Sequence, residues 1–281
     1  MNSCSSAEIR RCRPLLGTFV EVKASGRNEA ELHRVVSAAF GAVERIQGLM
    51  SAHDPSSELS RLNSEAAWGP VAVSRDTFSV LQRAQALAAE SGGAFDYAVA
   101  PTLARWGMLP AHLSLDDPGG WRDVRLLRQR RVRFLRPLAL DLGGIAKGFA
   151  VDKALEVLRA GGATAALVNA GGDLRVFGPE PFLVHLRHPC RPGSCTQAVE
   201  LSEGALATSS PCFTERLWRR QRVSHLVNPL RQAAITGSVS VSVRAGQCWL
   251  ADALTKVVLN APALAERLLA RHEAEAFVFT A

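Results

Sequence analysis

The sequence predicts a single α+β domain in which helices are interleaved among the strands of a mixed β-sheet. Segments with the 3.6-residue apolar period of helices alternate with segments in which every second residue is apolar. No Gly/Ser/Pro-rich linker, internal repeat or low-complexity segment divides the 281 residues, and the apolar content of 47% is ordinary for a globular protein. We therefore expect one domain over residues 14–281, preceded by an N-terminal tail of residues 1–13.

The first half of the chain predicts one strand, several helices and a hairpin. The longest helix has apolar residues from Leu32 to Met50 on one face, and the next begins with Asp54 as its N-cap and Pro55 in its first turn. A later long helix is ended by the glycine pair Gly92-Gly93. The expected elements are a strand (17–24), helices (28–50, 54–62, 74–91 and a short one within 93–107) and a hairpin (123–135).

The second half predicts a strand–helix–strand unit followed by a strand-rich region. The apolar residues 137–144 are interpreted as a strand, an amphipathic helix follows up to Gly161, and residues 165–178 form the next strand with an interruption at 170–172. Such a unit has parallel outer strands and a right-handed crossover. The remaining expected elements are strands (182–187, 196–201, 222–227, 239–243 and 275–280) and helices (249–259 and 262–272).

The charge and the cysteines favour an ordinary protein without nucleic-acid or zinc binding. The net charge is +7, but the arginines are spread along the chain, and the two clusters at 128–136 and 216–222 flank strand-like segments. The six cysteines form no Cys-x-x-Cys pair and are expected to be free thiols. No apolar run is long enough for a signal peptide or an integral membrane segment. As written, the chain is expected to be cytoplasmic, or periplasmic if the true start lies upstream.

The stretch Asp141-Leu-Gly-Gly-Ile-Ala-Lys-Gly stands directly before a predicted helix and is the first candidate site. It is neither a dinucleotide fingerprint nor a P-loop. Even so, Gly143 and Gly144 allow a ligand to approach the backbone, and the helix N-terminus and Lys147 favour anions. The alternative is a tight turn before the helix with an ion pair on the surface. This segment alone does not decide between the two.

Four further segments carry residues suited to a ligand site. They contain Asn169 to Asp173 with two glycines in a strand, Phe95 and Asp96 after a glycine pair, His225 before a turn, and Asp252 at the start of a helix. Each also has a purely structural interpretation, since Phe95 suits a core and Asp252 favours a helix start through the helix dipole.

Eight segments occur in the order and spacing of the ApbE family, which the chain resembles from about residue 14 to residue 269. They are PLLGTFVEV, MSAHDPSSELSRLN, GGAFDYAVAPTLARWG, DLGGIAKGFAVDKA, LVNAGGDLRVFG, ALATSS, VSHLVNP and ADALTK. The resemblance implies an ApbE fold and a magnesium-dependent FAD:protein FMN transferase. Such enzymes transfer FMN from FAD to a threonine or serine hydroxyl of an acceptor flavoprotein and release AMP. Acceptors in the family are subunits of electron-transport complexes or soluble reductases.

The resemblance also implies roles for individual residues. His225 would assist the attack of the acceptor hydroxyl. The residues implied to contact FAD are Leu16, His53, Ala94, Phe95, Asp96, Asp141, Lys147 and Val227. The residues implied to hold Mg²⁺ are Gly144 through its carbonyl, Asp252 and Thr255. These types suit the chemistry, because Mg²⁺ prefers hard oxygen ligands and a histidine with a near-neutral pKa can take a hydroxyl proton.

The sequence departs from the family pattern close to this expected centre. Leu16, His53 and Asn228 replace residues typical of the family, and Lys256 stands where the family has a metal-binding threonine. An ammonium cannot ligate Mg²⁺, and four residues after Asp252 it would pair with that carboxylate. Three consequences remain open: Thr255 acts as the ligand, the metal binds more weakly, or Lys256 supplies the positive charge itself. The alternatives for function are accordingly an FAD-binding relative with weak or no transfer, and a pyrophosphatase that cleaves FAD to FMN and AMP.

Overall fold

A seven-stranded antiparallel sheet forms the centre of the computed structural model, which describes residues 7–191 and 193–280. Every strand pair within these residues is antiparallel. The strands follow one another in the order β1 (Ala7–Leu15), β2 (Thr18–Gly26), β6 (Ala165–Ala170), β7 (Asp173–Arg187), β8 (Cys195–Ser209), β13 (Val239–Ala245) and β14 (Glu275–Thr280).

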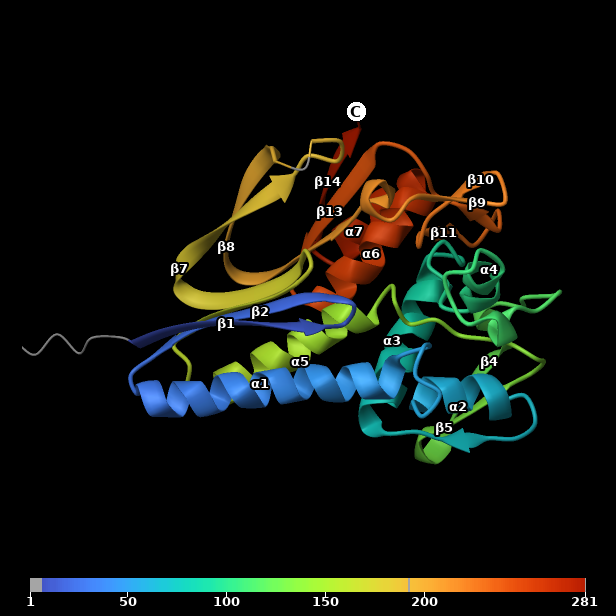
Figure 1. Cartoon of the computed structure of the whole chain (residues 1–281), viewed down its shortest axis with the longest axis horizontal. Helices are drawn as coiled ribbons and strands as arrows, with labels where there is room; N and C mark the ends of the chain where they lie inside the picture. Colours follow the sequence, from blue (N-terminus) through green and yellow to red (C-terminus); the bar gives the residue numbers. More distant parts are fainter. Residues whose placement is uncertain (1–6, 192, 281) are drawn as a thin grey trace, which may run out of the picture.

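Three helices pack on the sheet, and most of the chain between α1 and α5 forms a second, smaller region of the same domain. The three are α1 (Glu29–Met50), α5 (Ala146–Ala160) and α6 (Cys248–Asn260). α1 and α5 lie against each other beneath the strands β1 and β2 in Figure 1. α5 also packs on β6, while α6 packs on β8 and β13. Their apolar faces and the inner face of the sheet form one large core. Burial of these faces provides the main stabilisation of the fold.

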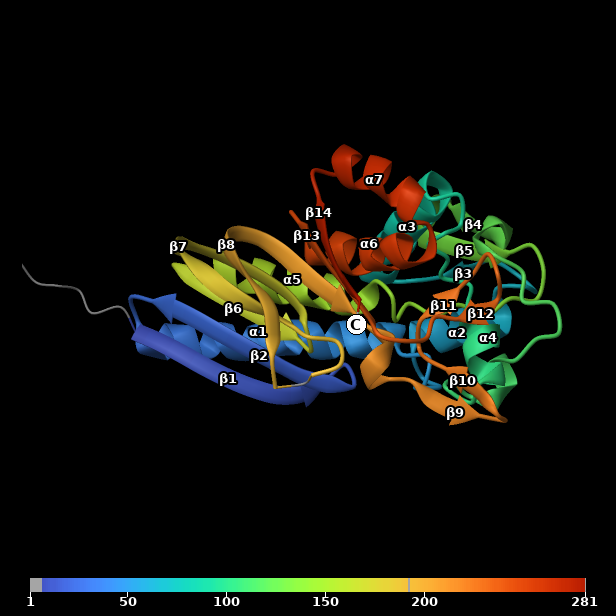
Figure 2. The same ribbon diagram turned by 90° about the horizontal axis from the view of Figure 1, so that it is seen from above.

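The smaller region lies at the far end of α1 from the N-terminus and is visible at the right of Figures 1 and 2. It contains helices and short strands: α2 (Glu58–Glu65), α3 (Arg75–Glu90), α4 (Ala100–Arg105), β3 (Val71–Ala72), β4 (Val124–Leu127) and β5 (Arg131–Phe134). Two hairpins, β9 (Arg216–Trp218) with β10 (Gln221–Val223) and β11 (Val227–Asn228) with β12 (Ala233–Ala234), lie beside it. α7 (Pro262–Arg271) leads back from α6 to β14.

The predicted α+β class, the long helices and most strands are confirmed. α1 begins after Asn28, whose side chain accepts a hydrogen bond from the backbone N–H of Glu31. The predicted cap of the short helix is wrong, because α2 begins after Ser57. Asp54 instead accepts hydrogen bonds from Ser56, so its side chain stabilises the preceding turn.

The predicted strand over residues 137–144, and with it the parallel crossover unit, is wrong. The backbone of this segment bonds to partners other than a strand. The side chain of Asn63 accepts a hydrogen bond from Leu140 N–H at 2.8 Å and donates to the Leu140 carbonyl at 3.1 Å, and Asp141 N–H donates to the Tyr97 carbonyl at 2.8 Å. The interruption at residues 170–172 is a tight turn that makes β6 and β7 an antiparallel hairpin. Its glycines have φ of 65° and 106°, a region that glycine adopts readily.

Residues 7–13, expected in an N-terminal tail, form most of β1 and pair with β2, while residues 1–6 lie outside the described residues. The predicted strand 222–227 is divided between β10 and β11. Within the described residues, no helix combines the length and apolar character that a membrane span requires.

Candidate functional site

One pocket gathers seven of the residues predicted to form the site. It lies where the loop after α3, the turn before α5, the β11 strand and the second half of α6 meet. The predicted residues that line it are Ala94, Phe95, Asp96, Asp141, Gly144, His225 and Val227. Tyr97, Val99, Leu226, Pro229, Lys256 and Asn260 complete the lining. The pocket therefore joins segments that are up to 166 residues apart in the sequence, as in the hydrogen bond from Asn260 to Ala94.

The loop after α3 presents Phe95 and Asp96 to this pocket. It turns at Gly92 and Gly93, which have φ of 58° and 90°, and Phe95 N–H donates to the side chain of Ser91. Two backbone N–H groups, of Ala98 at 2.8 Å and of Trp121 at 3.2 Å, donate to the Asp96 carboxylate. Burial raises the pKa of Asp96 to about 6, although these hydrogen bonds oppose the shift. The carboxylate is thus held in a fixed orientation.

Asp141, His53 and His225 form an electrostatically linked group at the pocket. Burial raises the pKa of Asp141, opposed by a hydrogen bond from Gly143 N–H and by the charges of His225 and His53. Burial lowers the pKa of His225, and the nearby Asp141 opposes that shift. His225 is therefore neutral at neutral pH and can accept a proton. A side chain at Gly143 would lie within about 3.1 Å of the Asp141 carboxylate, so glycine leaves room for it.

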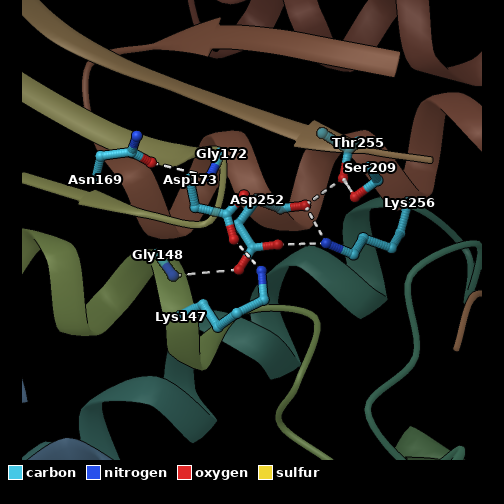
Figure 3. A network of polar contacts seen from close by, with 9 residues as sticks. All are labelled: Lys147, Gly148, Asn169, Gly172, Asp173, Ser209, Asp252, Thr255 and Lys256. Carbon is cyan, nitrogen blue, oxygen red and sulfur yellow. Dashed lines mark hydrogen bonds and ion pairs between the residues drawn. The ribbon is translucent and has the colours of Figure 1, made fainter. Parts of the chain in front are cut away.

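A buried cluster of two lysines and two aspartates lies next to the pocket (Figure 3). Lys147 pairs with Asp173, and Lys256 pairs with Asp252. Both carboxylates are almost completely buried, with side-chain exposures of 1% and 0%. Burial opposes the charge of Asp252, but Lys147 and Lys256 together hold its pKa below the usual range. Asp173 and Asp252 likewise raise the pKa of Lys147 against the effect of burial. Buried charges arranged in this way compensate one another.

The close packing of α5 against α6 positions Asp252. A Cβ atom on Gly148 would lie 2.3 Å from the carbonyl oxygen of Cys248, so only glycine allows the two helices to approach this closely. Gly148 N–H donates to the Asp252 carboxylate at 3.2 Å. The carboxylate of Asp152 accepts hydrogen bonds from the N–H groups of Cys248 and Trp249, both at 2.9 Å, which fixes the first turn of α6 on α5.

The residues predicted to hold Mg²⁺ do not fit a divalent cation in this arrangement. One Asp252 oxygen is bonded to Lys256 and the other to Gly148 N–H. The Thr255 hydroxyl is bonded to the Asp252 carbonyl at 2.6 Å and to the Ser209 hydroxyl at 2.7 Å. Each aspartate of the cluster is already paired with a lysine. Across residues 7–191 and 193–280, no three His, Cys, Asp or Glu side chains are arranged to hold a metal.

The other predicted FAD contacts do not line the pocket. Lys147 belongs to the buried cluster, and His53 is close enough to influence the pKa values of Asp141 and His225. Leu16 occupies the β1–β2 turn with φ of 56°, and its N–H donates to the Gln47 side chain. The role of each in FAD binding stays a prediction.

Sequence reasoning missed Asn260, which holds two walls of the pocket together. Its amide nitrogen donates to the carbonyls of Ala94 at 2.8 Å and Val227 at 3.3 Å, while its buried side-chain oxygen has no hydrogen-bond partner among the described residues. The only sequence signal is its position two turns after Asp252, on the same face of α6.

A larger cavity of about 250 Å³ lies elsewhere, between α2 and residues 137–139. Its lining includes Trp68 and His112 but none of the predicted site residues. We assign the functional site to the smaller pocket because buried charged and titratable groups converge there.

Comparison with known proteins finds similarity to one family. The model of the ApbE family matches residues 16–278. The FAD:protein FMN transferase of Treponema pallidum is 28% identical, over 88% of this chain and 77% of that protein. The one of Rhodobacter capsulatus is 32% identical, over 85% of this chain and 49% of that protein. A crystal structure of the ApbE protein of Thermotoga maritima is 25% identical, has a TM-score of 0.86, and covers 97% of this chain and 94% of that chain.

Proposed function

Because the chain belongs to the ApbE family, we propose that it is an FAD:protein FMN transferase. In the proposed reaction, a threonine or serine hydroxyl of an acceptor flavoprotein attacks the phosphorus of the FMN half of FAD. A new P–O bond forms, the bond from that phosphorus to the bridging oxygen breaks, and AMP leaves with the bonding electrons. The acceptor is expected to be an electron-transport subunit or a soluble reductase.

The observation that carries the proposal is the meeting of His225, Asp141 and Lys256 in one pocket. Neutral His225 accepts the proton of the attacking hydroxyl, a contribution typically worth ~10²–10⁴-fold in rate. Asp141 beside it favours the imidazolium form that results. Phe95 and Asp96 offer an aromatic surface and a hydrogen-bond acceptor, which suit a flavin ring.

The sequence also predicts that transfer depends on Mg²⁺, and this stays a prediction. When bound, such an ion would neutralise phosphate charge and orient the bridging oxygen. Gly144, Asp252 and Thr255 are the residues expected to hold it, but the carboxylate of Asp252 and the hydroxyl of Thr255 already bond to other groups of the chain. No step proposed here passes through a metal.

The test is to incubate the protein with FAD and Mg²⁺, with and without an acceptor peptide that contains a threonine, and to follow AMP release and the mass of the peptide. AMP release only with the peptide, together with a mass increase equal to bound FMN, would support transfer. AMP release without the peptide would instead identify a pyrophosphatase. Bound flavin with no AMP under either condition would identify a binding protein, and both of these results would refute the proposal.

A further inference from the structure

Lys256 brings an ammonium group to the lining of the pocket. It lies one turn after Asp252 on α6 and lines the pocket together with Asp141 and Gly144. Its Cε atom lies 3.5 Å from the position that a Cβ of Gly144 would take. The ammonium therefore lies between the turn that precedes α5 and the carboxylate of Asp252, which Figure 3 shows from close by.

The hydrogen bonds of Lys256 hold the ammonium in place and leave it able to bind a ligand. It donates to a carboxylate oxygen of Asp252 and, at 2.9 Å, to the Asp252 carbonyl. An ammonium has three N–H donors, so one remains for a further acceptor. The side chain is 15% exposed, compared with 0% for Asp252, so Lys256 is the member of this ion pair that reaches the pocket.

A divalent cation at Asp252 would have to displace this ammonium or accept its repulsion. The second lysine of the cluster, Lys147, would add to that repulsion, because both lysines contribute to the electrostatic environment of Asp252. In the cluster of Lys147, Asp173, Asp252 and Lys256, each carboxylate already has a lysine as its partner. In this arrangement, lysine side chains of the protein provide the positive charge that a bound metal ion would otherwise supply.

We propose that Lys256 is the resident cation of this pocket, which binds the pyrophosphate of FAD directly and makes FAD binding independent of a divalent metal. This inference rests on the proposed function and narrows it. In the transfer step the ammonium contacts the oxygens around the breaking P–O bond and stabilises the charge that AMP carries away. The proton of the acceptor hydroxyl still passes to His225, so the balance of the reaction is unchanged.

The experiment measures FAD affinity by quenching of flavin fluorescence, in EDTA and then in millimolar Mg²⁺. Wild-type affinity should be the same within about twofold in the two buffers. Lys256→Met keeps most of the side-chain volume without the charge, and should bind FAD about tenfold or more weakly in EDTA, since a charge-assisted hydrogen bond is lost. Lys256→Arg keeps the charge and should stay within a few fold of wild type.

Lys256→Thr tests the exchange of ammonium for metal. It removes the cation from Asp252 and adds a hydroxyl, so its FAD affinity should be low in EDTA and rise about tenfold when Mg²⁺ is added. Lys23→Thr, which removes a surface lysine of β2 that pairs with Glu8, is the matched control and should behave as wild type. Thermal unfolding of each variant establishes that it is folded before its affinity is compared.

Wild-type binding that requires Mg²⁺, or unchanged affinity of folded Lys256→Met in EDTA, would overturn the inference while the proposed function stands. Failure of the wild type to bind FAD in either buffer would refute the proposed function, and the role of Lys256 with it.

Discussion

Gly148→Ala is expected to destabilise the protein, although helix propensity alone predicts the opposite. Alanine in a helix interior is more favourable than glycine by about 1 kcal/mol. At Gly148, however, the added Cβ would lie 2.3 Å from the Cys248 carbonyl oxygen and 2.7 Å from Trp249 N. Ordinary contact begins at 3.4 Å, so α5 and α6 would have to separate by about 1 Å. The obstacle is backbone, which cannot rotate away.

The magnitude follows from these two opposing effects. Overpacking a close-packed core costs about 1–3 kcal/mol, and a clash with rigid backbone belongs at the upper end. Subtracting the gain in helix propensity leaves a net loss of about 2 kcal/mol in the free energy of unfolding. Separation of the helices also lengthens the bond from Gly148 N–H to Asp252, so FAD affinity should fall as well.

Urea unfolding measures the effect, with Gly41→Ala as the control. Gly41 is exposed in the middle of α1, and a Cβ there would meet nothing within 4 Å. The control should therefore gain up to about 1 kcal/mol, so the two substitutions shift the unfolding midpoint in opposite directions. A Gly148→Ala protein as stable as the wild type would show that α5 and α6 are not packed as closely as the structure indicates.

Three further predictions concern the pocket. His225→Gln should lower acceptor-dependent AMP release by ~10²–10⁴-fold with little change in FAD binding, and an unchanged rate would exclude His225 as the base. Because burial lowers the pKa of His225, the kcat/KM of the wild type should rise with pH and level off before neutral pH. Burial raises the pKa of Asp96 to about 6, whereas a value of ~3.9 is expected in the unfolded chain. The protonated Asp96 carboxyl therefore contributes its full share to the free energy of unfolding below pH ~3.9, and this share is lost as the pH rises through about 6. In Asp96→Asn the free energy of unfolding, measured with urea, should no longer show this fall of about 2–3 kcal/mol with rising pH. A fall as steep as that of the wild type would show that another group titrates. Asn260→Ala should lower the free energy of unfolding by about 1–3 kcal/mol and weaken FAD binding, because the carbonyls of Ala94 and Val227 lose their donor. A variant with the stability and the FAD affinity of the wild type would contradict the bridging role of Asn260.

The sequence predicted the long helices well because their stability comes from local signals. Asn28 and Ser74 cap α1 and α3 as their side chains suggest, and the apolar period places the buried faces correctly. The segment 137–144 was misinterpreted because apolar residues without a clear period fit several structures. Its backbone partners, Asn63 and Tyr97, lie far away in the sequence, so no local pattern could reveal that it is a loop.

In the candidate site, too, the sequence predicted many of the residues but not all of the contacts between them. Motif order was enough to name seven of the residues that line the pocket, since the resemblance covers most of the chain. The spacing of Asp252 and Lys256 predicted their ion pair, which is confirmed, but no motif indicated that Lys147 would pair with Asp173 beside it. Asp252 alone predicts a metal ligand, but the structure gives it Lys256 as an immediate partner and Lys147 as a second positive charge. A buried carboxylate needs a positive partner, and a lysine that already fills this role leaves no need for a metal ion beside it. Because Lys256 already provides a positive charge beside Asp252, the charge of Lys256 decides whether the site needs an external cation.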